Sequence, residues 1–406
     1  MKRTMLALGA GLALTLSVGI FITCGGSKTP IHVSCKDTVP EFQTEKPKKL
    51  KVFLENSGSM DGYMCEGSKL KDAIYDYMTD LNNCTDTISL NYINSQVIPY
   101  ENDLESYIKN LNPNSFKAAG GNRLNSDLAA CIKQVLNQVD KNSVCMFISD
   151  CILDLPSGDA TNYLNNCKIS IKDAINKRRD KVKDLGVVIV KMMSNFDGKY
   201  YYPSRDDTLT KGDTLIKGDR PYYIWMFGDK KYLASIMSKV PFETELKEYG
   251  YENHVAYTNS SKPYFDIGNA LDISFRKIKP NGSVYELMIA ANLSTTLQSE
   301  EELKKTENYR LNNGYEVDKV VASTKGGKYT HFIKFNVPKN CKSQVVTLSF
   351  HSPQPKWIDE TNDTTGKNIK ANINKTTGIA TLINGVAESY KMEKNISELT
   401  FIITKE

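Results

Sequence analysis

Residues 50–60 read LKVFLENSGSM, an apolar run followed directly by a loop of asparagine, serine and glycine. The alternation of Leu50, Val52 and Leu54 and the turn residues that follow predict a strand over 50–54. In open α/β sheets, ligands bind beyond the carboxyl ends of the strands. We therefore expect a functional site in the loop that begins at Glu55.

Similar apolar segments recur downstream, at 144–148, 186–190 and 222–227. Helical patterns lie between the strand-like segments, at 69–81, 126–139 and 163–185. Strands that are apolar throughout and alternate with helices are typical of a parallel sheet that is covered on both faces. The sequence therefore predicts an α/β domain over 48–245, with a doubly wound and mostly parallel sheet.

The loop after the first strand resembles the metal-ion-dependent adhesion site of von Willebrand factor A domains. The first loop of that family reads Asp-x-Ser-Gly-Ser-Met. Here Ser57, Gly58, Ser59 and Met60 match it, and Glu55 stands in place of the aspartate.

Two later segments strengthen the resemblance, which covers roughly residues 48–245. The Gly-Gly pair that precedes Asn122 resembles the family's Gly-Gly-Thr segment, with Asn122 in place of the threonine. The apolar strand that ends at Asp150 resembles the family's strand ending in Thr-Asp-Gly, with Cys151 in place of the glycine. The three segments follow one another in the family's order.

This resemblance implies a von Willebrand factor A-like fold and a site for Mg²⁺, or for Mn²⁺ or Ca²⁺, formed by Glu55, Ser57, Ser59, Asn122 and Asp150. Such a cation would accept an acidic residue from a protein partner. All five side chains supply oxygen, which hard cations prefer. Glu55 is longer than aspartate and Asn122 offers an amide oxygen, so we expect weaker coordination. The alternative is the same fold with its loop held by hydrogen bonds and no cation.

The N-terminus has the pattern of an export signal. A positive start at Lys2 precedes an apolar run that ends at Thr23, and Cys24 follows directly. A cysteine at this position resembles the lipobox of bacterial lipoproteins. We therefore predict a signal peptide over 1–23, lipidation of Cys24 and a tether over 24–47. The alternative is an uncleaved anchor, because the run is nearly long enough to span a bilayer.

A lipoprotein of this kind would be anchored to the membrane of the cell envelope. Gly25 differs from the aspartate linked to inner-membrane retention, which favours the outer membrane, on its periplasmic face or at the surface. The net charge is +5, and removing the leader with Lys2 and Arg3 leaves +3. Charge this small and unclustered argues against a nucleic-acid partner.

Beyond residue 260 the sequence changes character. Strand-like runs occur at 284–289, 331–335, 345–350 and 399–403. Their connections are rich in Asn, Thr, Gly and Lys, and the most obvious helical pattern covers 300–306. We predict a linker over 246–275 and a smaller, mostly-β, sandwich-like domain over 276–406.

Two other functions are open at this stage. Trp357 would be a sugar-stacking platform in a glycan-binding accessory protein, although packing in a core or loop is the favoured interpretation. Ser57 or Ser59 would be the nucleophile of an envelope hydrolase, but a nucleophile needs a base, and no histidine lies in a recognisable motif. The protein is therefore predicted not to be an enzyme. Eight cysteines besides Cys24 permit disulfides in an exported chain, without indicating their pairing.

Overall fold

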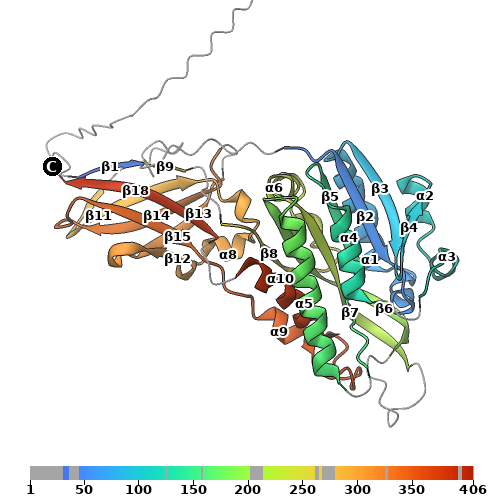
Figure 1. Cartoon of the computed structure of the whole chain (residues 1–406). Coiled ribbons are helices and arrows are strands. Elements are labelled where there is room, and N and C mark those ends of the chain that lie inside the picture. Colours follow the sequence, from blue (N-terminus) through green and yellow to red (C-terminus); the bar gives the residue numbers. More distant parts are fainter. Residues whose placement is uncertain are drawn as a thin grey trace, which may run out of the picture.

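The computed structural model describes residues 31–35, 45–123, 127–156, 159–201, 214–260, 265–267, 279–324, 328–391 and 396–405. Figure 1 shows a large helix-covered sheet beside a smaller part that is built mainly of strands. Cys24 and the predicted signal peptide lie outside the described residues. Within the described chain, no helix combines the length and apolar character needed to cross a membrane.

The large sheet has seven strands in the described residues, in the order β4-β3-β2-β5-β7-β6-β8. In chain order they are β2 (Lys49–Glu55), β3 (Thr87–Ile93), β4 (Val97–Tyr100), β5 (Ser143–Ser149), β6 (Leu185–Tyr200), β7 (Thr214–Asp229) and β8 (Tyr251–Tyr257). The predicted strands at 50–54, 144–148, 186–190 and 222–227 all lie in this sheet. The α/β class is therefore confirmed.

The prediction of a mostly parallel sheet is wrong, because the sheet is mixed. Within the described strands of this sheet, only β2 with β3 and β2 with β5 pair in parallel. β7 turns back after β6 and inserts between β6 and β5, antiparallel to both, while β4 and β8 are antiparallel edge strands. The apolar runs in β6 and β7 reflect burial on both faces, which a central antiparallel strand shares with a parallel one.

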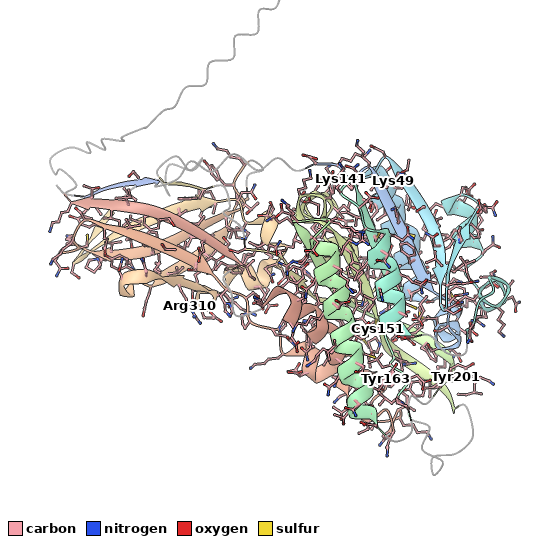
Figure 2. The ribbon with its side chains drawn as sticks, viewed as in Figure 1. Lys49, Lys141, Cys151, Tyr163, Tyr201 and Arg310 are labelled. Carbon is pink, nitrogen blue, oxygen red and sulfur yellow. The ribbon has the colours of Figure 1, made fainter. Side chains whose placement is uncertain are left out.

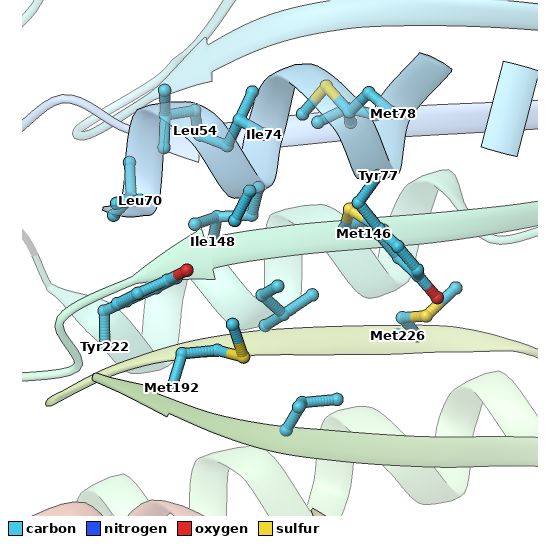
Figure 3. Close-up of a cluster of buried hydrophobic side chains, with 14 of the residues drawn as sticks. Leu54, Leu70, Ile74, Tyr77, Met78, Met146, Ile148, Met192, Tyr222 and Met226 are labelled. Carbon is cyan, nitrogen blue, oxygen red and sulfur yellow. The ribbon is translucent and has the colours of Figure 1, made fainter. Parts of the chain in front are cut away.

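Helices cover both faces of this sheet. One face carries α1 (Lys69–Asn83), α2 (Leu104–Lys109), α3 (Pro113–Ala118), α6 (Lys230–Lys239) and α7 (Phe242–Glu245). The other carries α4 (Leu128–Gln138) and α5 (Ala160–Arg179). Figure 3 shows Leu70, Ile74 and Met78 of α1 facing the buried side chains of the sheet. This confirms the helix predicted over 69–81, whose apolar spacing places one stripe toward the core.

Two antiparallel sheets share a separate core and form the predicted sandwich-like part. One contains β1 (Ile31–Cys35), β18 (Ser397–Lys405), β15 (Gln344–Phe350) and β12 (Tyr309–Leu311). The other contains β9 (Phe265–Ile267), β10 (Lys279–Asn281), β11 (Val284–Ala291), β14 (His331–Pro338) and β13 (Val317–Ala322). Phe335 and Phe401 meet between the sheets with ring centroids 5.5 Å apart.

Two predicted boundaries are corrected. The tether over 24–47 contains β1, which pairs with β18 along five residues and places Ile31 in the sandwich core. The linker over 246–275 contains β8, whose pairing with β6 completes the large sheet. In both cases a short strand depends on a partner that lies far away in sequence, so local composition does not reveal it.

Part of the predicted β domain over 276–406 belongs to the α/β domain instead. After β15 come α9 (Trp357–Thr361), β16 (Asn362–Asp363), β17 (Thr376–Thr377) and α10 (Ile379–Tyr390). α10 packs along α5, and its apolar residues join the core on that face of the large sheet (Figure 1). The other short helices in the described residues are η1 (Gly58–Met64), η3 (Ser294–Thr296), α8 (Glu300–Lys304), η4 (Thr306–Asn308) and η5 (Asn312–Gly314).

Candidate functional site

The predicted site residues gather at one end of the large sheet. The carboxyl ends of three strands, β2, β5 and β6, point in the same direction. At this edge of the sheet, Ser149 at the end of β5 pairs with Tyr223 of β7. Figure 2 shows Cys151 and Tyr201 toward this end, opposite Lys49 and Lys141. This is the edge at which α/β sheets place their ligands.

The loop after β2 brings two serine hydroxyls together. The hydroxyls of Ser57 and Ser59 are hydrogen-bonded to each other, with their Oγ atoms 3.0 Å apart. Gly58 lies between them under the ring of Tyr201, and a Cβ at this glycine would come within 3.2 Å of that ring. A larger residue at this position would require the exposed Tyr201 side chain to shift by a few tenths of an ångström.

Arg123 holds this loop in place. Its Nε donates to the Asn56 carbonyl at 2.8 Å, its Nη2 donates to the Ser57 carbonyl at 3.3 Å, and it forms an ion pair with Asp61. The Arg123 carbonyl in turn accepts from the Gly58 amide at 3.0 Å. The second predicted loop therefore contacts the first, as the sequence indicates, but its arginine makes the contacts.

The glycine pair before Asn122 permits a tight approach to Asn94. Gly121 has φ +74°, and a Cβ there would lie 2.2 Å from Asn94 Oδ1. Asn94 Nδ2 donates to Asn56 Oδ1 at 2.7 Å and so ties the loops together. Asn122 itself is exposed, and its backbone amide donates to Ser95 Oγ at 3.0 Å.

Glu55 lies at the buried end of β2. It is 2% exposed, and the hydroxyl of Ser149, on the neighbouring strand β5, donates to its carboxylate. The carboxylate therefore joins two central strands. The sequence of the first loop does not predict this contact, because Ser149 lies on another strand.

Asp150 follows Ser149 and is 1% exposed. Its Oδ1 accepts from the Ile152 amide at 3.3 Å, whereas its Oδ2 has no hydrogen-bond partner among the described residues. Burial raises the pKa of Asp150, while the nearby Arg220 guanidinium and the Ser59 hydroxyl act in the opposite direction. A buried carboxylate oxygen without a donor is a position where a cation or water would be bound.

Part of this arrangement fits a hard cation. Ligands at right angles, each about 2.1 Å from Mg²⁺, lie about 3.0 Å apart. The Ser57 and Ser59 hydroxyl oxygens have the same 3.0 Å separation, and Asp150 adds an oxygen with free capacity. In the described residues, no group of three or more His, Cys, Asp or Glu residues has a metal-binding arrangement. A cation here would therefore depend on the serine hydroxyls.

Sequence reasoning missed the buried residues beneath the loop. Arg220 of β7 is 1% exposed, and its guanidinium carbon lies 4.8 Å from the Phe196 ring centroid and 4.7 Å from that of Tyr200. Tyr63 of η1 packs edge-on against Phe196, with centroids 5.0 Å apart. The local signal for Arg220 is a charged residue that lies one residue, Pro221, before the apolar run of β7.

The segment from α9 to α10, which packs on the α/β domain, also contacts the loops at this edge of the large sheet. The Leu153 amide donates to the Thr377 carbonyl at 3.0 Å, and the Tyr223 hydroxyl donates to Thr376 Oγ1 at 3.2 Å. Gly378 has φ +79°, and a Cβ there would lie 2.6 Å from the Leu153 side chain. The loop after Asp150 is thus fixed by a segment more than 200 residues away in sequence.

Cys151 has φ +56°, in the left-handed region that favours glycine. This conformation gives a physical reason for a glycine-like position directly after Asp150. We expect Cys151→Gly to be more stable than Cys151→Ala by about 1 kcal/mol, because both lose the thiol and only glycine adopts this φ without strain.

Urea unfolding of the two variants measures this difference. The matched control is Cys131, which is equally buried but lies inside α4. There the order should reverse, with alanine more stable than glycine by about 1 kcal/mol. A Cys151→Ala variant more stable than Cys151→Gly would contradict the expectation. All seven cysteines whose side chains are described are free thiols.

Comparison with known proteins adds no relative. No protein-family model matches the chain, and no curated protein sequence matches it significantly.

Proposed function

We propose that this chain is an envelope-anchored lipoprotein whose α/β domain is von Willebrand factor A-like and binds a protein partner without catalysing a reaction. A divalent cation, Mg²⁺ or Mn²⁺, would be held at the end of β2 and β5. The observation that carries the proposal is the pair of hydroxyls of Ser57 and Ser59, 3.0 Å apart beside the unpartnered oxygen of Asp150.

Ser57 and Ser59 would supply hydroxyl oxygens to the cation, and Asp150 would supply its carboxylate. When bound, the cation would offer a coordination position to an acidic residue of the partner. Few protein charges reach it directly, which would leave it electropositive. Glu55 would act on the strands through Ser149, and Asn122 would lie at the rim, so the proposed ligand set is narrower than the five residues predicted from sequence.

The glycan-binding alternative loses its proposed platform. Trp357 is largely buried in the core shared by α5 and α10, where it packs against the α/β domain. An indole in that position contributes to packing and does not offer a ring face to a sugar. The observations therefore favour the cation-dependent partner site.

A pull-down from envelope extract tests the proposal. We expect partner capture by the purified protein in Mg²⁺, loss of capture in EDTA, and recovery when Mg²⁺ is restored. Ser57→Ala combined with Ser59→Ala should remove the Mg²⁺-dependent capture, whereas Ser238→Ala, at an exposed serine of α6, should not. Equal capture by the wild type in Mg²⁺ and in EDTA would overturn the cation-dependent part.

A further inference from the structure

Exposed lysines gather at the edge of the large sheet that lies opposite the candidate site. Lys48 and Lys49 lie at the start of β2, and their backbone amides donate to the Asn142 carbonyl at 3.0 and 3.3 Å. Lys141 directly precedes Asn142, so the pairing of β2 with β5 brings the three lysines together. Figure 2 shows Lys49 and Lys141 next to each other at one end of the α/β part, with Tyr201 toward the other end.

The turn between α5 and β6 extends this group of lysines. Lys181 and Lys183 are both exposed in the turn. The Lys230 amide, directly after β7, donates to the Asp184 carbonyl at 2.8 Å, and β7 ends beside the start of β5. Three segments that are distant in sequence therefore meet at one edge. We call Lys48, Lys49, Lys141, Lys181 and Lys183 the basic edge.

The charge of the basic edge is not neutralised within the described chain. None of its five lysines forms an ion pair with a described residue. Acidic groups at the same end of the sheet pair with other lysines instead, namely Asp86 with Lys46, Asp140 with Lys51 and Asp184 with Lys230, each at 3.1 Å. Asp180 is exposed in the same turn and offsets part of the charge, but the excess remains positive.

Capping of the neighbouring helices does not account for these lysines. Cations are favourable beside the last carbonyls of a helix. At the end of α4 other residues meet this need, because Lys51 Nζ donates to the Gln138 carbonyl at 2.6 Å and Arg178 donates to the Val139 carbonyl at 2.9 Å. α5 carries three basic residues in its own last turn. The lysines of the basic edge are therefore available to a partner.

The predicted lipid anchor would lie close to this side of the molecule. Cys24 precedes Ile31, the first residue of β1, by seven positions, a length of chain that spans at most about 25 Å. Figure 1 shows β1 toward the upper side of the view, and Figure 2 shows Lys49 and Lys141 toward the same side. With the lipid anchor of the proposed function, the basic edge would thus face the membrane.

We propose that the basic edge is an interaction surface for anionic phospholipid headgroups. Lysine ammonium groups bind phosphate as compact point charges, and each lysine near an anionic membrane strengthens binding roughly fivefold. The contact orients the α/β domain so that Ser57 and Ser59, at the opposite edge of the sheet, face away from the bilayer. This orientation rests on the proposed lipid anchor, whereas the affinity for anionic lipid does not.

Sedimentation with lipid vesicles tests the surface in EDTA, on a chain that begins at residue 25. That chain keeps every described residue and lacks the lipidated cysteine. We expect binding to vesicles that mix phosphatidylglycerol with phosphatidylcholine, and no binding to phosphatidylcholine alone. Added salt should weaken the binding, because it screens exposed charges.

Two triple variants locate the binding surface. Lys48→Gln, Lys49→Gln and Lys141→Gln combined should weaken vesicle binding about a hundredfold. The matched control combines Lys117→Gln, Lys356→Gln and Lys370→Gln, three exposed lysines outside the basic edge that form no ion pair with a described residue. It makes the same change in net charge and should bind nearly as the wild type does. All six lysines are exposed, so both variants should keep the wild-type Tm.

Three results would overturn the proposal: no binding to the phosphatidylglycerol vesicles, equal binding to both kinds of vesicle, or equal weakening by the two triple variants. Binding to heparin without binding to vesicles would also overturn it, and would assign the basic edge to a soluble polyanion. The assay contains no lipid anchor and no free divalent cation. Its outcome therefore does not depend on lipidation of Cys24 or on the cation site at Ser57 and Ser59, and the two proposals can fail separately.

Discussion

Ile383→Asp is expected to lower the free energy of unfolding by about 5 kcal/mol, enough to unfold a domain of ordinary stability. Ile383 lies on α10, is fully buried, and belongs to the core under the large sheet. The substitution removes an apolar side chain and places a carboxylate in a core lined by hydrophobic residues, with no lysine or arginine among the core residues described there. Urea unfolding followed by tryptophan fluorescence measures the change, because Trp225 and Trp357 both lie in this core.

Glu388→Gln is the control on the same helix. Glu388 forms exposed ion pairs with Lys168 at 2.9 Å and Lys172 at 3.1 Å. Exposed pairs contribute about 1 kcal/mol or less, so this variant should remain close to the wild type. If Ile383→Asp had an equally small effect, α10 would not be an integral part of the α/β core.

Asp150→Ala is expected to lower Mn²⁺ affinity by at least about a hundredfold, because it removes the one carboxylate of the proposed ligand set. In metal-free buffer the same variant should keep its fold but lose some stability, because the Asp150 carboxylate accepts from the Ile152 amide and lies near the Arg220 guanidinium. Loss of Mn²⁺ binding without loss of fold would separate a ligand role from a structural role.

The matched control for this variant is Asp140→Asn. Asp140 directly precedes the turn into the same strand, β5, at the opposite end of the sheet, and pairs with Lys51 at 3.1 Å. Its replacement should leave Mn²⁺ affinity unchanged. Equal Mn²⁺ affinities in the wild type, Asp150→Ala and Asp140→Asn would show that Asp150 is not a ligand of the cation.

Sequence patterns located the central strands and the serine loop because these signals are local. The alternation in β2 and the turn residues after it lie within a dozen residues, and the hydroxyls of Ser57 and Ser59 meet within one loop. Glu55 illustrates the limit of such signals. Its partner, Ser149, comes from a neighbouring strand, so its interaction depends on how the sheet is assembled.

The sequence of α10 carries a local helical signal. Ile379, Leu382, Ile383 and Val386 have the spacing of one helical face. The pattern indicates an amphipathic helix, and the strand-rich surroundings masked it. The docking of α10 on α5 was beyond local reasoning, because the two helices are separated by about 200 residues.

Arg220 shows a feature that no single segment encodes. The pairing of β6 with β7 places Ser194 opposite Arg220 and brings Phe196 near the guanidinium. The apolar pattern reveals neither this register nor the position of β7 between β5 and β6. Burial was predictable from composition, whereas strand order was not.

A Mn²⁺ titration of the purified protein, followed by electron paramagnetic resonance, tests the central claim most directly. The account predicts one saturable Mn²⁺ site per chain in the wild type, and loss of that site when Ser57→Ala and Ser59→Ala are combined. No saturable Mn²⁺ binding in the wild type, or the same binding in the double variant, would contradict a cation site built on the serine pair.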